Sequence, residues 1–267
     1  MSAELDLWLC DVKCIDDDVL IDEYRSILDA SELAKEQFFR FPADRLRYLV
    51  TRALARTVLS RYVETKPYEW EFSTSPFGRP VVVNAGFGLL DIHFNISHTQ
   101  DMIIMAVSRG GEVGIDIETI RPDEPLVDEA QRFFAPAEIA ALNKVPTSQK
   151  AYRFFEYWTF KESYIKALGM GIYLPLDKFA FHFPDDYSVA IEIEADLHDR
   201  AESWHFFQFM PTSSHLVAVC AQSDGVPIPS LHIRQIVPQR EVVALDVQIL
   251  RKSANSSTGI LNAPFNF

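Results

Sequence analysis

The sequence predicts an α+β fold built around antiparallel sheet. Helical and strand patterns occur in blocks: a helical block at 31–63 precedes strands at 92–118, and a second helical block at 127–169 precedes strands at 177–221. Block-wise order favours an α+β fold over a doubly wound parallel sheet. Each half runs from helices to strands, which suggests a duplicated architecture, although no residue-level repeat accompanies it.

The N-terminal half is expected to begin with a strand over residues 5–12, where apolar and polar side chains loosely alternate. Residues 31–63 should follow as helix, because Ser31 is a capping residue and apolar residues recur every three or four positions. Pro42 lacks the N–H that a helix interior needs, so it should divide this region into two helices. The Pro- and Gly-bearing stretch 73–84 is predicted to be loop.

Three strands are expected next, at 92–96, 102–108 and 112–118. The turn at 109–111, Arg-Gly-Gly, suits a hairpin between the last two. Helical periodicity returns at 127–143 and 147–169, and Gly169 is placed to end the second helix. Four more strands are predicted, at 177–183, 188–195, 203–210 and 215–221.

The length of 267 residues allows one or two domains, and 48% hydrophobic with 24% charged residues is an ordinary globular composition. The element order suggests an N-terminal α+β subdomain at 1–108 and a C-terminal α+β subdomain at 109–240. Residues 241–267 would form a C-terminal extension, expected to be loosely ordered because of its Ser- and Asn-rich stretch from Ser253.

Cysteine usage and the N-terminal sequence predict a cytoplasmic protein. Cys10, Cys14 and Cys220 are odd in number and include no Cys-x-x-Cys pair, which disfavours a disulfide scaffold or a zinc ribbon. The N-terminus has neither a basic start nor a long apolar run. No stretch approaches the ~18 apolar residues of a membrane span, so no membrane partner is expected.

The charge balance argues against a nucleic-acid partner. The formal net charge is -13 and the isoelectric point is near 4.9, whereas binding to nucleic-acid phosphates needs clustered positive charge. The charge is unevenly spread, however: residues 35–61 hold seven basic residues and two acidic ones. This basic segment could attract a small anion to an otherwise acidic protein.

Two carboxylates share a face of the strand expected at 112–118. In Val113-Gly-Ile-Asp-Ile-Glu118 the alternation of side chains puts the apolar residues on one face. Asp116 and Glu118 then lie together on the other face, about 7 Å apart, and Gly114 is expected to leave open space beside them. For an isolated Asp-x-Glu, a solvated strand face is the better interpretation.

A third carboxylate, Glu162, shifts that balance. On the helix expected at 147–169, Glu162 falls inside the apolar stripe and Lys166 on its border. A carboxylate on a core-facing stripe is costly unless it is paired or binds a ligand. An exposed Glu162–Lys166 pair explains this helix about as well as a functional site does. Three carboxylates without a Cys/His pattern suggest Mg²⁺, or Mn²⁺, before Zn²⁺.

The segment Phe94-Asn-Ile-Ser-His-Thr99 places several hydrogen-bonding side chains where a strand becomes loop. Ser97, His98 and Thr99 would suit phosphate binding there, although a lone His is more often structural. The sequence contains no Walker A motif, no Gly-x-Gly-x-x-Gly and no Gly-x-Ser-x-Gly. Ordinary nucleotide kinases, Rossmann enzymes and α/β-hydrolases are therefore disfavoured.

Three motifs in order resemble those of the 4′-phosphopantetheinyl transferases, of the type that activates surfactin synthetase. They are Phe94-Asn-Ile-Ser-His98, Val113-Gly-Ile-Asp-Ile-Glu118 and Trp158-Thr-Phe-Lys-Glu-Ser-Tyr-Ile-Lys-Ala-Leu-Gly-Met-Gly171. The resemblance covers roughly residues 5–225. It implies a pseudo-twofold monomer of two similar α+β subdomains, with the active site between them. It also implies transfer of 4′-phosphopantetheine from coenzyme A to a serine of an apo acyl, peptidyl or aryl carrier protein, releasing adenosine 3′,5′-bisphosphate.

The resemblance also assigns roles to individual residues. Asp116, Glu118 and Glu162 would be the metal ligands, and Glu162 would also activate the serine hydroxyl. Lys166 and His98 complete the expected catalytic set, Lys166 contacting the diphosphate. The coenzyme A site would be lined by Lys35, Arg47, Arg79, Ser97, His98 and Lys166.

Two positions depart from the family pattern. The family often has lysine where Arg79 stands, and a base three residues before Lys35, where this chain has Glu32. Two other functions remain open on the sequence: a coenzyme A- or carrier-binding module without turnover, and a Mg²⁺-dependent nucleotide phosphohydrolase. The intact carboxylates with Lys166 favour turnover, while the phosphohydrolase gives His98 and the basic segment no role.

Overall fold

The computed structural model describes residues 4–121, 126–171, 174–223 and 230–253 and has the predicted α+β fold. The N-terminal half comprises β1 (Glu4–Asp11), α1 (Asp18–Ser26), α2 (Ala30–Phe38), α3 (Pro42–Leu59), β2 (Phe72–Thr74), β3 (Pro80–Val82), β4 (Ile92–His98) and β5 (Met102–Arg109). The C-terminal half comprises β6 (Val113–Thr119), α4 (Val127–Phe133), α5 (Pro136–Lys144), α6 (Thr147–Leu168), β7 (Phe179–His182), β8 (Ser188–Ile193), β9 (Trp204–Thr212) and β10 (His215–Gln222). The chain then adds β11 (Ser230–Val237), β12 (Glu241–Ala244) and β13 (Ile249–Ser253).

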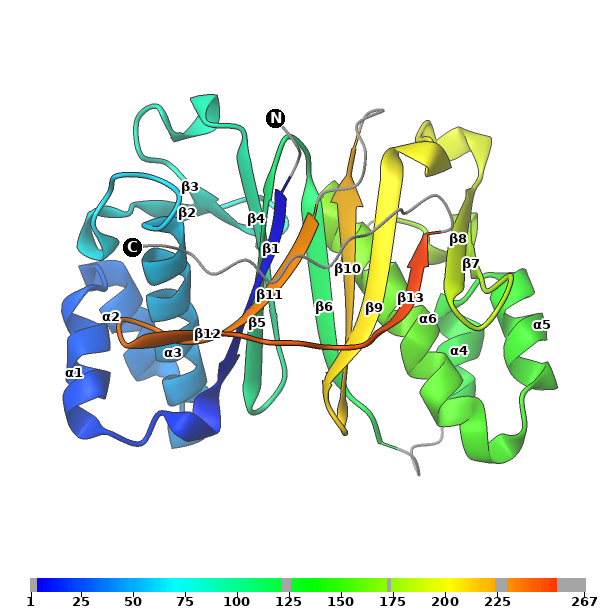
Figure 1. The fold of residues 1–267 in the computed structure, drawn as a ribbon, viewed down its shortest axis with the longest axis horizontal. Helices are drawn as coiled ribbons and strands as arrows, with labels where there is room; N and C mark the ends of the chain where they lie inside the picture. The colour runs from blue at the N-terminus through cyan, green and yellow to red at the C-terminus, as the bar shows by residue number, and fades with distance from the viewer. Residues whose placement is uncertain (1–3, 122–125, 172–173, 224–229, 254–267) are drawn as a thin grey trace.

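Two sheets lie back to back between two groups of helices (Figure 1). The first sheet has the strand order β12-β11-β1-β5-β4, and the second has β6-β10-β9-β13-β8-β7. Their strands pair antiparallel except for β1 with β11 and β8 with β13. Helices α1–α3 cover the outer face of the first sheet, and α4–α6 cover the outer face of the second.

Three apolar clusters follow this layering. Alternation along β1 sends Leu5, Leu7 and Leu9 toward the second sheet, where they meet apolar residues of β6, β9 and β10. The intervening Trp8 faces α1–α3, in a cluster with Phe94. Aromatic residues of α6 fill the third cluster, between the second sheet and α4–α5. The two halves therefore share the central cluster.

The hairpin expected at 109–111 is not formed, because β5 and β6 belong to different sheets. Gly110 has a φ of +89°, a conformation that glycine adopts readily, and the chain passes there from one sheet to the other. Strand β6 instead lies beside the edge strand β4. Asn95 Oδ1 accepts a hydrogen bond from the Ile115 N–H, and Ser97 Oγ accepts one from the Ile117 N–H. Side chains thus satisfy the edge N–H groups that a backbone ladder would otherwise pair.

The segment after residue 229 connects the two sheets, so the expectation of a loosely ordered tail is wrong for 241–244 and 249–253. Strand β11 pairs with β1 and with β12, which places residues 230–237 in the N-terminal sheet rather than in the expected C-terminal subdomain. The chain then crosses to β13 in the second sheet (Figure 1). Residues 254–267 lie outside the described part of the chain.

Other elements differ from the sequence prediction in detail. Helix α1 was not predicted, and the stretch 73–84 contributes to the short β2–β3 hairpin. The helix expected at 127–143 is two helices, because Pro136 begins α5. The division at Pro42 and the end of α6 at Gly169, with φ +67°, are confirmed.

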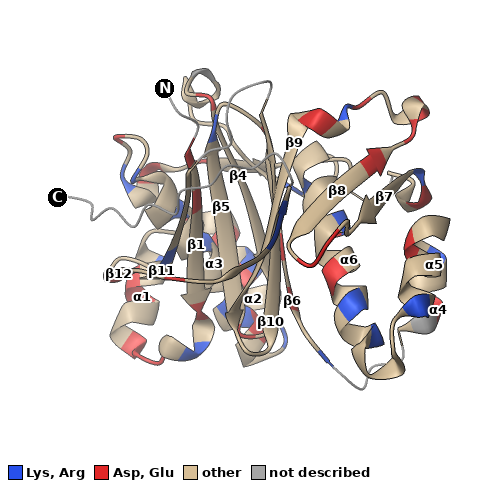
Figure 2. Ribbon diagram, turned by 45° about the vertical axis from the view of Figure 1, so that its right-hand side comes forward, with Lys and Arg blue, Asp and Glu red and all other residues tan. Residues whose placement is uncertain are grey.

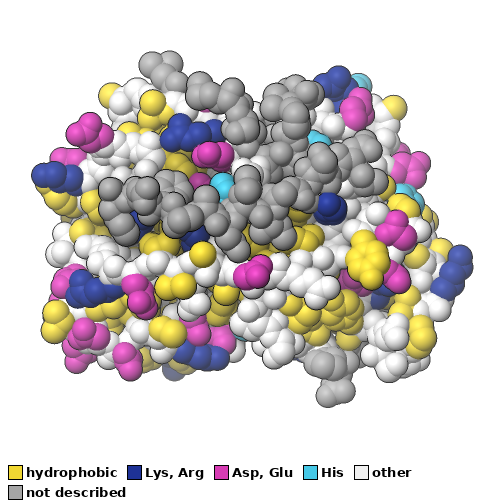
Figure 3. All heavy atoms as spheres, in the orientation of Figure 1, with side chains coloured by type: hydrophobic (Ala, Val, Ile, Leu, Met, Phe, Trp, Pro, Cys, Tyr) yellow, Lys and Arg dark blue, Asp and Glu magenta, His cyan; other side chains and the backbone are white. Residues whose placement is uncertain are grey.

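Charge of both signs is distributed over both halves. Figure 2 shows both acidic and basic residues on the helices of each half. Acidic, basic and hydrophobic side chains are interspersed on the face shown in Figure 3. The described helices include none with the length and apolar character of a membrane span.

Candidate active site between the two sheets

The polar face of β6 is covered by α6 and is not a solvated strand face. A Cβ atom at Gly114 would lie 2.0 Å from the Ser163 carbonyl oxygen and 2.4 Å from the Ala167 nitrogen. The open space expected beside the carboxylates is therefore occupied by helix backbone. Gly114 is the residue that permits this approach, because any side chain would push α6 away from β6. The approach brings the polar side chains of α6 to those of β6.

Asp116, Lys166 and Ser97 meet where β4, β6 and α6 come together. Lys166 Nζ donates to Asp116 Oδ1 at 2.5 Å and to Ser97 Oγ at 3.0 Å. Ser97 Oγ also donates to Asp116 Oδ1 at 3.0 Å. The Asp116 side chain is buried, whereas 28% of the Lys166 side chain is exposed, so the group opens to solvent on the lysine side.

Asp116 lies close enough to Glu118 and Glu162 for its charge to raise the pKa of both. Burial and the Asp116 charge raise the pKa of Glu118 to about 7, although Trp158 Nε1 donates to its Oε1 at 3.1 Å. The same two causes raise the pKa of Glu162. Burial opposes the charge of Lys166, but Asp116 and the two glutamates raise its pKa overall. Lys166 thus supplies one positive charge against the three carboxylates of Asp116, Glu118 and Glu162, which leaves the cluster with an excess of negative charge when all three are ionised.

The donor chemistry of this cluster suits a hard cation. Within the described ranges, no three His, Cys, Asp or Glu side chains are arranged to hold a metal ion as they stand. However, Asp116 Oδ2 is buried and has no hydrogen-bond partner among the described residues. A buried, unsatisfied oxygen beside mutually repelling carboxylates is stabilised by a bound cation. A donor set made only of oxygen favours Mg²⁺ or Mn²⁺ over Zn²⁺.

His98 and Arg47 border the same cluster. His98 ends β4, one residue after Ser97. Burial, together with the positive charges of Arg47 and Lys166, lowers the pKa of His98. Arg47 is on α3, where its Nη2 also pairs with Asp44 at 2.7 Å. Basic groups from both halves, Arg47 on α3 and Lys166 on α6, therefore lie close enough to His98 for their charges to act on it. Thr99 instead closes the β4–β5 turn, accepting from the Met102 N–H.

The basic segment 35–61 is only partly available to a ligand. Arg52 and Arg56 are buried and pair with Glu32, so they stabilise the fold. Glu32 also caps α2 through the Asp29 N–H, which explains why this position carries an acid rather than a base. Lys35 lies over the Tyr48 ring, 5.6 Å from its centroid. Among the described contacts, none joins Lys35 to the carboxylates.

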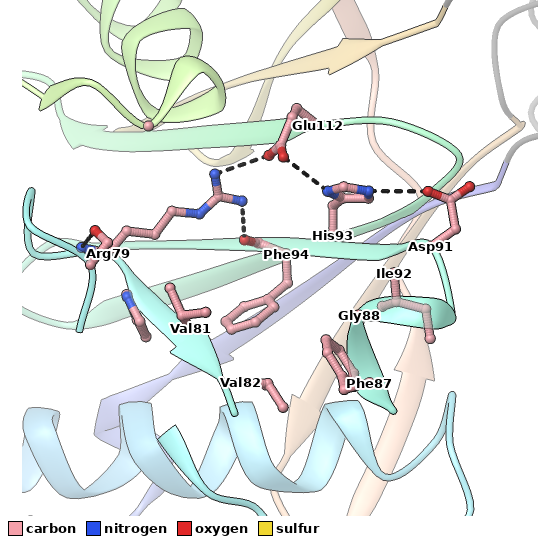
Figure 4. Close-up of a pocket in the computed structure, with 13 residues that line it drawn as sticks. Arg79, Val81, Val82, Phe87, Gly88, Asp91, Ile92, His93, Phe94 and Glu112 are labelled. Atoms are coloured by element: carbon pink, nitrogen blue, oxygen red, sulfur yellow. Dashed lines mark hydrogen bonds and ion pairs between the residues drawn. The ribbon is translucent and has the colours of Figure 1, made fainter. Parts of the chain in front are cut away.

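Arg79 lies apart from the carboxylates, on the wall of a cavity of about 550 Å³ (Figure 4). Its Nη1 pairs with Glu112 Oε2 at 3.0 Å, and its Nη2 donates to the Phe94 carbonyl at 2.9 Å. A Cβ atom at Gly169 would lie 3.6 Å from Nη1, so the C-terminal end of α6 passes close to the guanidinium. The described contacts place Arg79 beside the C-terminal end of α6, but none joins it to Asp116, Glu118 or Glu162.

Three residues of the quoted motifs that have no role assigned from the sequence also support this site. Trp158 orients Glu118, and Asn95 joins β4 to β6. Lys161 is fully buried and pairs with Glu138 at 2.8 Å, which fixes α6 against α5. The available signal for Lys161 was its apolar and aromatic neighbours three and four residues away on the helix, which are Tyr157, Trp158, Tyr164 and Ile165.

Comparison with known proteins covers both halves of the chain. A family model described as the 4′-phosphopantetheinyl transferase superfamily matches residues 112–220. A second model, described as 4′-phosphopantetheinyl transferase, N-terminal, matches residues 21–110. Between them the two models include every residue assigned above to the site.

Curated relatives align over most of their own length. The 4′-phosphopantetheinyl transferase HetI of Nostoc sp. is 36% identical over 227 residues, which cover 84% of this chain and 90% of that protein. The 4′-phosphopantetheinyl transferase Sfp of Bacillus subtilis is 31% identical over 206 residues, covering 77% of this chain and 87% of that protein. With this level of identity over this length, the chain belongs to the 4′-phosphopantetheinyl transferase family.

Proposed function

We propose that this protein transfers the 4′-phosphopantetheine group of coenzyme A to a serine of an apo carrier protein, in the cytoplasm. The serine Oγ forms a bond to the phosphorus that carries pantetheine, and the bond from that phosphorus to the departing phosphate oxygen breaks. The products are the holo-carrier and adenosine 3′,5′-bisphosphate. The supporting observation is the deficit of positive charge at Asp116, Glu118 and Glu162, in a chain of this family.

The three carboxylates are proposed to hold Mg²⁺, or Mn²⁺ in its place. When bound, such an ion neutralises negative charge on the diphosphate and stabilises the departing oxygen. Lys166, which is partly exposed beside Asp116, is proposed to contact the same diphosphate and to supply a second positive charge. Its raised pKa keeps it protonated for that role.

Glu162 is the proposed proton acceptor for the carrier serine. Burial and Asp116 raise its pKa, and a carboxylate with a raised pKa is a stronger base when ionised. His98 is proposed as a neutral hydrogen-bonding group, since its pKa is lowered by burial and by Arg47. Ser97, Arg47, Lys35 and Arg79 are proposed to line the remaining coenzyme A phosphates. Because Glu32 forms buried ion pairs with Arg52 and Arg56, Lys35 is the proposed phosphate contact on α2.

The proposed partner is an acyl, peptidyl or aryl carrier protein. With a formal net charge of -13, this protein would repel an acidic carrier at long range. Docking is therefore expected to depend on local, partly apolar contacts. Phe134, which follows α4, is buried and stacks on Phe154, so it belongs to the core and not to such a docking surface.

The test is incubation with coenzyme A, Mg²⁺ and several apo carriers, followed by intact-mass measurement of each carrier. We expect a phosphopantetheine adduct on at least one of them. Glu162→Gln should lower the rate by roughly 10²–10⁴-fold, the usual contribution of a general base. Glu64→Gln makes the same change at an exposed carboxylate and should keep the wild-type rate. No adduct on any carrier, with coenzyme A bound, would instead support a binding module without turnover.

A further inference from the structure

Four ionisable side chains form a chain of contacts along the cavity that Arg79 lines (Figure 4). Glu112 is its centre: Oε2 pairs with Arg79 Nη1 at 3.0 Å, and Oε1 lies 3.1 Å from His93 Nδ1. His93 Nε2 in turn lies 3.2 Å from Asp91 Oδ1. Acidic and basic groups therefore alternate from Arg79 to Asp91. The motifs and roles assigned above give no function to Glu112, His93 or Asp91.

The four residues come from separate segments, so the contacts fix those segments relative to one another. Arg79 follows the turn of the β2–β3 hairpin, and its own N–H donates to Ser75 Oγ. His93 is on β4. Glu112 precedes β6, and its carbonyl accepts from the Gln222 N–H at the end of β10. Glu112 therefore connects the hairpin of the N-terminal half to the sheet of the C-terminal half.

The contacts among Arg79, Glu112, His93 and Asp91 are expected to add little to the stability of the fold. The Glu112 side chain is 40% exposed and that of Asp91 is 68% exposed. Ion pairs of this exposure contribute about 0–1 kcal/mol to stability. Asp91 also adopts a φ of +51°, which is uncommon for a residue other than glycine. The arrangement does determine where the Arg79 guanidinium points, because Glu112 and the Phe94 carbonyl each take one of its nitrogens.

We propose that Glu112 is a positioning residue that holds Arg79 ready for the coenzyme A phosphates, with His93 balancing the charge of Glu112. The proposal rests on the proposed function, which places Arg79 in the coenzyme A site. Glu112 and the Phe94 carbonyl each bind one guanidinium nitrogen, so other N–H donors of Arg79 remain for a phosphate. An arginine already held in its binding orientation loses less side-chain entropy when the ligand arrives.

The state of His93 should affect this positioning. Glu112 and Asp91 face its ring, and Arg79 faces the other oxygen of Glu112. With His93 protonated, two acids and two bases balance. With His93 neutral, one negative charge is left beside the phosphate site, which disfavours an anionic ligand.

The test is a double-mutant cycle on coenzyme A binding, measured by calorimetry without any carrier. Glu112→Ala should weaken binding about tenfold, which corresponds to ~1.4 kcal/mol. In the Arg79→Ala background the same change should have little further effect, because the residue it positions is gone. Glu112→Gln, which can still accept a hydrogen bond from Arg79, should recover part of the affinity. Glu64→Gln serves as the control and should bind as the wild type does.

The proposal is overturned if Glu112→Ala leaves the dissociation constant unchanged or lowers it. It is also overturned if the loss is equally large without Arg79, since Glu112 would then act on the fold. A second measurement follows affinity from pH 6 to pH 9: wild-type binding should weaken more steeply than that of His93→Gln. Parallel curves would remove His93 from the proposal. Because no carrier is present, failure of transfer with normal cycle results would count against the proposed function alone.

Discussion

Lys161 and Lys166 lie on the same helix, α6, yet their surroundings differ in a way that separates structure from function. The Lys161 side chain is fully buried and donates to three acceptors: Glu138 Oε2 and the carbonyls of Leu176 and Phe179. Glu138 accepts two further hydrogen bonds, from the N–H groups of Ala135 and Phe181. Burial lowers the pKa of Lys161 and raises that of Glu138, so each charge depends on its partner.

Lys166 has one carboxylate contact and two further carboxylates nearby. Its side chain is 28% exposed, and Asp116, to which it donates, keeps one buried oxygen without a partner among the described residues. Glu118 and Glu162 have raised pKa values because of burial and the Asp116 charge. A buried polar group that lacks a partner is costly, and a ligand that supplies one gains that energy on binding.

A buried charge whose partners are complete, such as that of Lys161, stabilises the fold. A buried charge whose partners are incomplete, such as that of Asp116, indicates a binding site. The Glu138–Lys161 pair has its acceptors and donors filled and fixes α6 in place. The Asp116–Lys166 pair lacks positive charge and opens to solvent. The following predictions test this contrast, from the largest expected effect to the smallest.

Lys161→Met should lower the free energy of unfolding by about 3–5 kcal/mol, because it leaves Glu138 buried without a counter-charge. Urea unfolding followed by circular dichroism measures this. Adding Glu138→Gln to the same variant should recover part of the loss. A loss below about 1 kcal/mol would show that the pair is not the structural element described here.

Lys166→Met should lower phosphopantetheine transfer by about 10²–10³-fold, the size expected for one group that stabilises transition-state charge. Its free energy of unfolding should fall by only about 1 kcal/mol, because Glu118 and Glu162 can take up a proton when the lysine is absent. Single-turnover mass measurement and urea unfolding give the two values. Equal loss of stability in Lys166→Met and Lys161→Met would contradict the contrast between the two pairs.

Glu32→Gln should lower the free energy of unfolding by about 1.5–3 kcal/mol, since it weakens charged hydrogen bonds from Arg52 and Arg56. Coenzyme A affinity of the folded variant should stay within about twofold of the wild type, because Glu32 stabilises the fold. Calorimetry on the folded variant provides the measurement. A large gain in affinity would mean that Arg52 and Arg56 are free to reach the ligand.

The smallest predicted effect concerns pH and stability. The hydrogen bond to Glu112, opposed by burial, raises the pKa of His93 above its ordinary 6.5. The resulting stabilisation is fully present below pH 6.5 and is lost as the pH rises through the raised value. The difference in unfolding free energy between wild type and His93→Gln should therefore shrink between pH 6 and pH 9. A difference that grows over this range would reverse the assigned direction.

Residue alternation and helical periodicity predicted much of the fold and of the site. The period of two along 113–118 placed Asp116 and Glu118 on one face, and the helical period placed Glu162 and Lys166 near them. These patterns describe one element at a time. They carry no information on how closely α6 approaches β6. The prediction of open space beside Gly114 was therefore wrong, because the backbone of α6 fills that space.

The parts of the fold and of the site that were predicted wrongly from the sequence share one physical cause, which is contact between segments that lie far apart in the chain. Strand β13 is short, and its pairing with β8 and β9 depends on residues far away in the chain. Strand β12 forms a local hairpin with β11, but β11 joins the sheet through β1, at the other end of the chain. The Gly-bearing turn before β6 predicts a change of direction but not that the chain enters a second sheet. In the sequence, Glu32 looks like an ordinary exposed residue of a helix. Only the fold brings Arg52 and Arg56 into contact with it. Contacts between distant segments leave no local pattern.

The most direct measurement of the central claim is the binding of Mn²⁺ in the presence of coenzyme A, followed by electron paramagnetic resonance. Wild type and Glu64→Gln should each bind one ion per chain. Asp116→Asn, which keeps the shape of the side chain but removes its charge, should lose that ion. An unchanged Mn²⁺ affinity in Asp116→Asn, or no bound ion in the wild type, would contradict a cation site at these carboxylates.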